Sequence, residues 1–417
     1  MLAQNANYDK ILPSDFDTDT QSRNIIPTND GGFAILGSRA TNQNGIYAHN
    51  FISFSKSGKI LTSKTHVVKR FSYYISKRVF KQLKDDNFLM TFQSSTDFSE
   101  SLVKTDINFK PIWSLSIEIV DFRHDIKKIL ELENGNILIV GSALRSKNKP
   151  TPYPYYYFYA EISPNGDVIR KQLYKLNCIN YSSSFSFVYD AQISPSGKLY
   201  LAIQGGEGYK SNTIVSLDIS TGKILFQRKM LYDVGWSSGI ISIFYDDKST
   251  QSSDQILGFI SENPQNDNRI NIFALDGENG AVKFTKSYSS FAGFGNIVSV
   301  EKSNGNLVVI STLKGDIYTV TFDKQGNIVT ANKELNHSTN YIQSTIQLKD
   351  GRIISKAEDI ECNGQLQLVI KFRGENNESP CTVPFTPQVM VSELTNSPES
   401  TIEASNITIN IINLVVI

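Results

Sequence analysis

Short apolar runs separated by polar turns recur along most of the chain. The first copy has an apolar run on each side of a turn at Asn29-Asp30-Gly31-Gly32. Asn-Gly and Asp-Gly pairs tolerate the positive φ angles of a tight hairpin, so each copy predicts two antiparallel strands. Further copies are centred on Asn134-Gly135, Ser196-Gly197, Asn304-Gly305 and Asp350-Gly351, and degenerate copies on Asp85-Asp86-Asn87 and Asp246-Asp247.

A second turn follows most of these hairpins, and its glycine recurs at a steady interval. These glycines are Gly58, Gly166, Gly222, Gly280 and Gly326; in the second unit Asn108-Phe109-Lys110 stands where the glycine is expected. The step from Gly166 to Gly222 is 56 residues, and the next step is 58. Each unit therefore holds four strands and two turns in roughly 50 residues, the size of a propeller blade.

The repeats predict an all-β chain, namely a seven-bladed β-propeller of four-stranded antiparallel blades over residues 1–381. Continuous apolar runs such as Ile137–Val140 and Leu307–Ile310 fit strands that are buried on both faces. The segment Asp125–Leu132 has a helix-like spacing of apolar residues, but its alignment with the other repeats favours a strand.

We expect the two ends of the chain to play different structural roles. Residues 5–13 contain Tyr8–Leu12, which we expect to complete the last blade and so remove an exposed sheet edge. Residues 382–417 are expected to be a linker and a short β extension with a strand-like run at Ile407–Ile412. This extension is either a docking strand or the start of a truncated domain, and we favour truncation.

Charge and cysteine content narrow the classes of partner and location. Lys plus Arg and Asp plus Glu both number 41, and this neutral balance argues against nucleic acid or an anionic membrane as the main partner. No signal peptide is recognisable, and no apolar run reaches the roughly 18 residues of a membrane span. Cys362 and Cys381 flank the end of the last unit and either form a disulfide or stay unpaired, whereas Cys178 is expected to be free.

The turn motifs resemble those of known propeller families. Asp30-Gly31-Gly32-Phe33 resembles the Asp-Gly-Gly-aromatic hairpins of secreted bacterial propeller repeat proteins. The second-turn segments, such as Asp218 to Phe226, are similar in pattern to quinoprotein repeats, which usually place Trp where Phe226 and Phe284 stand here. Trp113 alone keeps that residue. The resemblance covers most of residues 5–380 and implies an extracellular or cell-surface protein.

Candidate catalytic and metal-binding residues are sparse in the sequence. The four histidines, His49, His66, His124 and His337, are far apart along the chain, so we predict no metal site. Two tryptophans are too few for the docking girdle of a quinoprotein, so we expect no quinone or other cofactor. The run Tyr155–Tyr159 is either a stacking surface for sugar rings or packing between blades, and we favour packing.

The connections between blades are unusually aromatic for turns. They carry Tyr74, His124, Tyr181, Trp236, Phe294 and Tyr341, which we predict to form a binding surface around one mouth of the channel. The alternative is that these rings plug the channel or pack against neighbouring loops.

The leading functional hypothesis is a secreted or cell-surface module that binds a protein or glycan through one propeller face. One alternative is a propeller enzyme, either a quinoprotein-like oxidoreductase or a polysaccharide-active enzyme. Another is a structural subunit of a larger surface or secretion assembly.

Overall fold

The protein folds entirely as β-strands and turns in the residues that the structure describes. The computed structural model describes residues 8–11, 24–40, 46–69, 79–93, 100–119, 122–145, 155–176, 187–204, 211–231, 236–246, 255–263, 269–289, 296–303, 306–313, 316–334, 341–348, 352–360, 366–373, 382–384, 388–390, 395–396, 402–405 and 409–413. A search of this part of the chain finds no helix suited to crossing a membrane.

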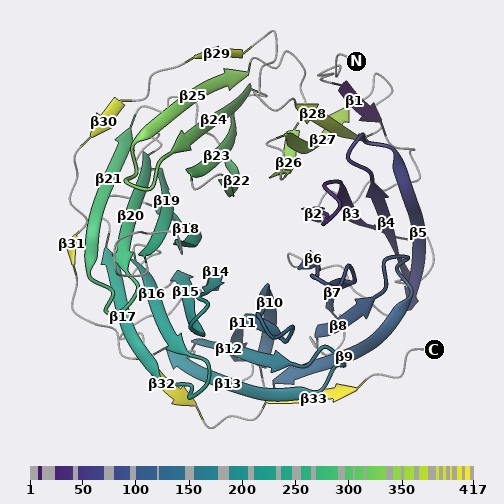
Figure 1. Cartoon of the computed structure of the whole chain (residues 1–417), viewed down its shortest axis with the longest axis horizontal. Coiled ribbons are helices and arrows are strands. Elements are labelled where there is room, and N and C mark those ends of the chain that lie inside the picture. The colour runs from purple at the N-terminus through teal and green to yellow at the C-terminus, as the bar shows by residue number, and fades with distance from the viewer. Residues whose placement is uncertain are drawn as a thin grey trace.

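The described strands form seven antiparallel sheets, which Figure 1 shows arranged radially as a ring. Blade 1 holds β2 (Asn24–Pro27), β3 (Phe33–Ala40), β4 (Ile46–Phe54) and β5 (Ile60–Lys69). Blade 2 holds β6 (Phe80–Gln82), β7 (Phe88–Gln93), β8 (Glu100–Thr105) and β9 (Pro111–Ile119). Blade 3 holds β10 (Phe122–Glu131), β11 (Ile137–Arg145), β12 (Tyr155–Ile162) and β13 (Val168–Leu176).

The same order continues around the ring. Blade 4 holds β14 (Phe187–Ile193), β15 (Lys198–Gln204), β16 (Ser211–Asp218) and β17 (Ile224–Leu231). Blade 5 holds β18 (Trp236–Asp246), β19 (Gln255–Asn263), β20 (Arg269–Asp276) and β21 (Val282–Ser289). Blade 6 holds β22 (Asn296–Ser303), β23 (Asn306–Leu313), β24 (Asp316–Phe322) and β25 (Ile328–Glu334). The all-β class and the four-stranded antiparallel blade are confirmed.

The last sheet joins the two ends of the ring. Blade 7 holds β26 (Tyr341–Gln347), β27 (Ile353–Ile360), β28 (Leu366–Arg373) and, from the N-terminus, β1 (Tyr8–Ile11). β1 pairs antiparallel with β28, with Tyr8 opposite Phe372 and Ile11 opposite Val369. The N-terminal strand therefore occupies the outer position of this sheet, where its sequence was expected to lie.

Backbone geometry at the turns matches the repeat alignment, including the degenerate copies. The turn glycines of the repeats have positive φ: Gly31, Gly58, Gly135, Gly166, Gly197, Gly222, Gly280 and Gly326. Asp86 and Phe109 hold the same conformation, with φ of 64° and 60°. These two residues stand at glycine positions of the pattern, so a left-handed turn is imposed there by the hairpin. The turns expected at Gly305 and Gly351 lie outside the described residues.

Blade faces are buried on both sides, as the continuous apolar runs predicted. Residues 137–140 and 307–310 are each at most 5% exposed. The tyrosine-rich strand β12 is also core, since Tyr156, Tyr157 and Tyr159 are at most 8% exposed. The idea of a sugar-stacking surface on β12 is therefore wrong, and packing between blades accounts for these rings. The segment Asp125–Leu132 lies largely in strand β10 rather than a helix.

The C-terminal segment runs around the outside of the ring in the opposite direction to the blades. It contributes β29 (Thr382–Pro384), β30 (Gln388–Met390), β31 (Thr395–Asn396), β32 (Ile402–Ser405) and β33 (Ile409–Asn413). These strands are fifth strands of blades 6, 5, 4, 3 and 2 respectively, and all five pair antiparallel. We call them the belt; they are yellow at the rim in Figure 1. The part of the chain expected to be a linker thus begins with a strand, and the five described strands of the C-terminal segment pair with the ring.

Candidate functional site

Most of the residues predicted to bind a ligand lie where side chains are not described. Tyr74, Tyr181 and Phe294 lie outside the described residues, as do Cys178, Cys362 and Cys381. The first strand of each blade lies nearest the centre of the ring, and we call it the inner strand; the last is the outer strand (Figure 1). Trp236 and Tyr341 are the first residues of the inner strands β18 and β26. The backbone therefore places these two at the end of the channel wall where the connections from the preceding blades arrive.

His124 lies in the core rather than on a surface. The residue is 1% exposed, its ring packs edge-on against Phe158 at 6.3 Å, and its Nε2 lies 2.8 Å from the carbonyl oxygen of Ile117. Burial lowers the pKa of His124, because the charged imidazolium loses its hydration. The assignment of His124 to a ligand-binding surface is corrected accordingly: it joins blades 2 and 3.

Two aromatic residues at comparable positions are also core residues. Phe80 begins β6 and Phe122 begins β10, and they are 5% and 8% exposed. Phe122 packs edge-on against Tyr156 with ring centroids 4.7 Å apart. Phe122 shares a core cluster with Leu102 of blade 2, and Phe80 shares one with Phe51 of blade 1. These two rings therefore pack between blades, which was the alternative to binding.

The inner strands β10, β14 and β18 carry β-bulges, which interrupt their pairing with the next strand. Backbone amides beside the bulges of β10 and β18 donate instead to acidic side chains of the preceding blade. β10 shifts register between Ile126 and Lys128, and the amide of Ile126 donates to Glu100 Oε2 in blade 2 at 2.5 Å. Glu100 is 2% exposed. Burial, reinforced by the nearby charge of Asp125, raises the pKa of Glu100 well above its ordinary value. A buried acid bonded to the backbone serves to join two blades.

Asp190 connects three blades in the same way. It lies on β14, is 4% exposed, and accepts a hydrogen bond from the amide of Ile243 in blade 5 at 3.1 Å. Its other oxygen lies 2.6 Å from Lys128 Nζ in blade 3. Its charge is thus compensated inside the wall, as a buried carboxylate requires. A search of the described residues finds no group of three or more His, Cys, Asp or Glu that could hold a metal ion.

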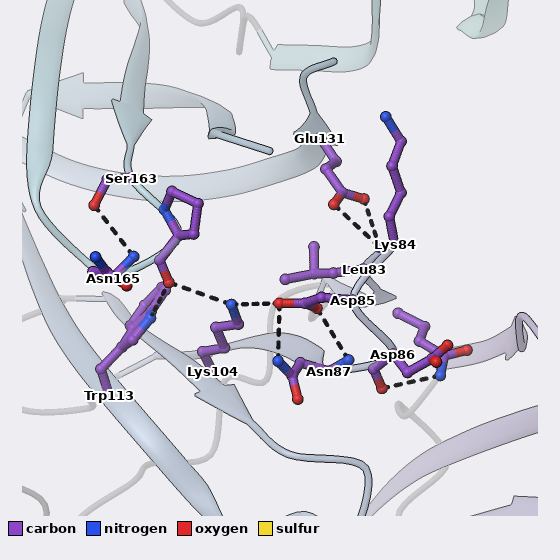
Figure 2. Close-up of polar contacts among 12 residues, drawn as sticks. Leu83, Lys84, Asp85, Asp86, Asn87, Lys104, Trp113, Glu131, Ser163 and Asn165 are labelled. Carbon is purple, nitrogen blue, oxygen red and sulfur yellow. Dashed lines mark hydrogen bonds and ion pairs between the residues drawn. The ribbon is translucent and has the colours of Figure 1, made fainter. Parts of the chain in front are cut away.

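Figure 2 shows a third polar junction, between the turns of blades 2 and 3. Lys104 is 4% exposed, and its Nζ donates to Asp85 Oδ2 at 2.8 Å and to the carbonyl of Pro164 at 3.3 Å. Trp113 Nε1 donates to the same carbonyl at 2.9 Å. Burial alone would raise the pKa of Asp85, but hydrogen bonds from Lys104 and Asn87 outweigh it and hold that pKa below its usual range.

Aromatic side chains of the outer strands pack on the turn glycines of the following blade. Trp113 lies 3.3 Å from the position that a Cβ of Gly166 would occupy. Phe226 and Phe284 lie against Gly280 and Gly326 in the same way, closer than a real Cβ would allow. Packing of an aromatic ring on a turn glycine thus recurs at three contacts between neighbouring blades, through Trp113, Phe226 and Phe284.

The outer edges of the blades have a repeated irregularity. Each outer strand from β5 to β25 has a bulge just after its turn, and the extra residue is Leu61, Ile112, Ile169, Leu225, Lys283 or Val329. The five aliphatic members are 38–54% exposed. A bulge interrupts the row of outward amides and carbonyls, so this half of each outer edge is a poor template for another strand.

The belt strands occupy the other half of the outer edges. Pairing on β9 covers Leu115–Ile119, and on β13 it covers Leu173–Leu176. Leu115 is six residues beyond Phe109, and Leu173 is seven beyond Gly166. Counted from Gly58, the equivalent stretch of blade 1 starts near Lys64. This stretch lies on β5, which is the edge of its sheet in the described part of the chain.

The candidate site is therefore the outer edge of β5, which Figure 1 shows on the side of the ring away from the belt strands β30 and β31. β5 has ten residues, while the other outer edge without a belt strand, β1, has four. At its beginning Ile60, Leu61 and Lys64 are exposed. Sequence reasoning missed this site, although the apolar run at Ile407–Ile412 hinted that the C-terminus pairs with something.

Comparisons with known proteins give no family. No protein-family model matches the chain, and no curated protein matches it. Among solved structures, a europium-containing methanol dehydrogenase is 10% identical with a TM-score of 0.48, covering 81% of this chain and 76% of that one. The polysaccharide lyase Uly1 is 8% identical with a TM-score of 0.49, covering 86% and 91%. The Dos1 propeller is 10% identical with a TM-score of 0.44, covering 85% and 84%. Similarities this distant carry no argument about function.

Proposed function

We propose that the protein is a protein-binding module that takes up an extended segment of a partner polypeptide along the outer edge of β5. The supporting observation is the belt, because five blades already bind an extended chain at the equivalent edge. Main-chain hydrogen bonds supply much of the affinity in such strand addition, and the side chains of alternate residues supply specificity. An extracellular or cell-surface location, implied by the family resemblance, belongs to the same proposal.

The charge along β5 indicates what the partner strand contains. Lys64 and Lys69 lie on this strand, and lysine on an edge disfavours pairing with a second copy of the same strand. In the belt, Glu403 of β32 stands opposite Lys175 of β13 in the register. A partner strand with apolar residues and a carboxylate opposite a lysine therefore fits β5 better than a second copy of β5.

The test uses the belt's own sequence as the probe. A fluorescent peptide with the sequence of residues 400–413 should bind the full chain saturably, and hydrogen exchange should show new protection in β5. Val67→Pro and Val68→Pro form a matched pair, since successive amides of an edge strand point in opposite directions. The variant that loses the outward amide should abolish peptide binding while its melting temperature stays close to that of the wild type.

Two results would count against the proposal. One is that Val67→Pro and Val68→Pro both fold and both bind the peptide as the wild type does. The other is protection that appears on the outer strands of other blades, which would mean that the peptide merely displaces the belt.

A further inference from the structure

Two of the four histidines of the chain meet in one register pair. β4 and β5 pair antiparallel, and His49 lies directly opposite His66. The register runs without a shift from Thr62 to Lys69, so the bulge at Leu61 leaves this pair undisturbed. The two residues are separated by 17 positions in the sequence, which gave no reason to connect them.

This register places two histidine residues on the same face of one sheet. Residues directly opposite in an antiparallel pair have Cβ atoms about 4.5–5.5 Å apart and leave the same face. Phe51, two residues beyond His49 on β4, identifies that face, because its ring stacks on Phe109 of blade 2 at 4.5 Å. His49 and His66 are thus on the face of blade 1 that is turned towards blade 2.

We propose that His49 and His66 together bind a divalent transition-metal ion of the class of Zn²⁺, Ni²⁺ and Cu²⁺. Imidazole nitrogen suits these ions, and a Zn–N bond of about 2.0–2.1 Å is compatible with two imidazoles from facing positions. The pair supplies two protein ligands, and water supplies the others. Such an ion would fix the outer strand β5 to β4, on a blade that the belt does not reach in the described residues.

The experiment is a titration of the untagged full chain with NiCl₂ or ZnCl₂, followed by calorimetry. The wild type should bind one ion per chain. His49→Gln and His66→Gln should each weaken binding by at least about tenfold, since loss even of an outer partner of a metal ligand costs about 10–100-fold. His337→Gln removes a histidine outside the pair and should bind as the wild type does. Equal binding by the wild type and both pair variants would overturn the proposal.

A second measurement decides the matter if a pair variant does not fold. Electron paramagnetic resonance of the wild type with one equivalent of Cu²⁺ counts the bound imidazole nitrogens. Two nitrogens support the proposal. One nitrogen, or no saturable copper binding, overturns it.

Discussion

Phe51 of blade 1 and Phe109 of blade 2 stack with ring centroids 4.5 Å apart and planes 25° from parallel, although Phe109 holds a left-handed backbone with φ of 60°. Phe109 also stacks on Phe88 at 4.8 Å and is fully buried. At later junctions a ring from the outer strand packs on a turn glycine of the next blade. Between blades 1 and 2 the turn itself supplies the ring.

At most positions glycine destabilises a fold more than alanine does, and at Phe109 we expect the reverse order of stability. Phe109→Ala loses the stacked ring, at about 3–5 kcal/mol, and keeps the backbone strain. Phe109→Gly loses the same ring but relieves strain of roughly 1–3 kcal/mol, so it should be the milder change. Urea denaturation of both variants measures this. A glycine variant less stable than the alanine variant would contradict the assignment of strain.

A compensating substitution at Thr62 should restore part of the loss. Thr62 pairs with Ser53 just after the bulge, as Trp113 pairs with Lys104 and Phe226 with Ser216. Thr62→Phe in the Phe109→Gly background rebuilds the arrangement of the later junctions. The double variant should be more stable than Phe109→Gly alone, whereas Thr62→Phe in the wild type should overpack the junction and destabilise it.

The buried acid Glu100 should make stability depend on pH. Burial raises the pKa of Glu100, so between its ordinary and its raised value the folded chain holds a proton that the unfolded chain has lost. The free energy of unfolding should therefore fall as pH rises through that interval, by at most about 1.4 kcal/mol per pH unit. Glu100→Gln retains an oxygen acceptor for Ile126 and removes this dependence.

The measurement is urea denaturation of the wild type and Glu100→Gln from pH 4.5 upward. The stability of the variant relative to the wild type should grow with pH and then level off. Glu133→Gln, in an exposed turn, is the matched control and should show no such trend. A constant difference between Glu100→Gln and the wild type would refute the prediction.

Removing the amine of Lys104 should loosen blades 2 and 3. Lys104→Met keeps the length of the side chain but leaves Asp85 and the carbonyl of Pro164 without this donor. A hydrogen bond to a charged group contributes about 1.5–3 kcal/mol, so a loss of that order is expected on thermal or urea unfolding. Lys110→Met, an exposed lysine of the neighbouring turn, should lie within about 0.5 kcal/mol of the wild type. Similar stabilities of the two variants would speak against the buried junction.

The two ends of the chain should have different effects when they are removed. Deletion of residues 1–13 takes β1 from blade 7 and should lower the melting temperature markedly, because the ring loses its closure. Deletion of residues 382–417 uncovers five outer edges and should chiefly promote association of chains, seen by light scattering. An unchanged melting temperature after the first deletion would contradict the closing role of β1.

The sequence alone determined the repeat, its turns and the order of the strands. These features are local, since a hairpin depends on a few residues with positive φ between two apolar runs. The pattern even placed turns at Asp86 and Phe109, where the glycine is missing but the flanking runs hold the register. It also placed Tyr8–Leu12 beside the last blade, because one strand was missing from an otherwise regular count.

The tertiary structure decided what lies between blades and along the rim. Trp113 and Phe226 stand where blade 1 has Thr62, and no local pattern reveals that Phe109 supplies the missing ring there. Nor does any local pattern reveal that His124 is buried or that His49 lies opposite His66 in the register. Each depends on the pairing or packing of strands remote in sequence, and a register shift of one residue would reverse the face of every side chain. The course of the belt was equally hidden, because strand addition uses main-chain groups that every sequence possesses.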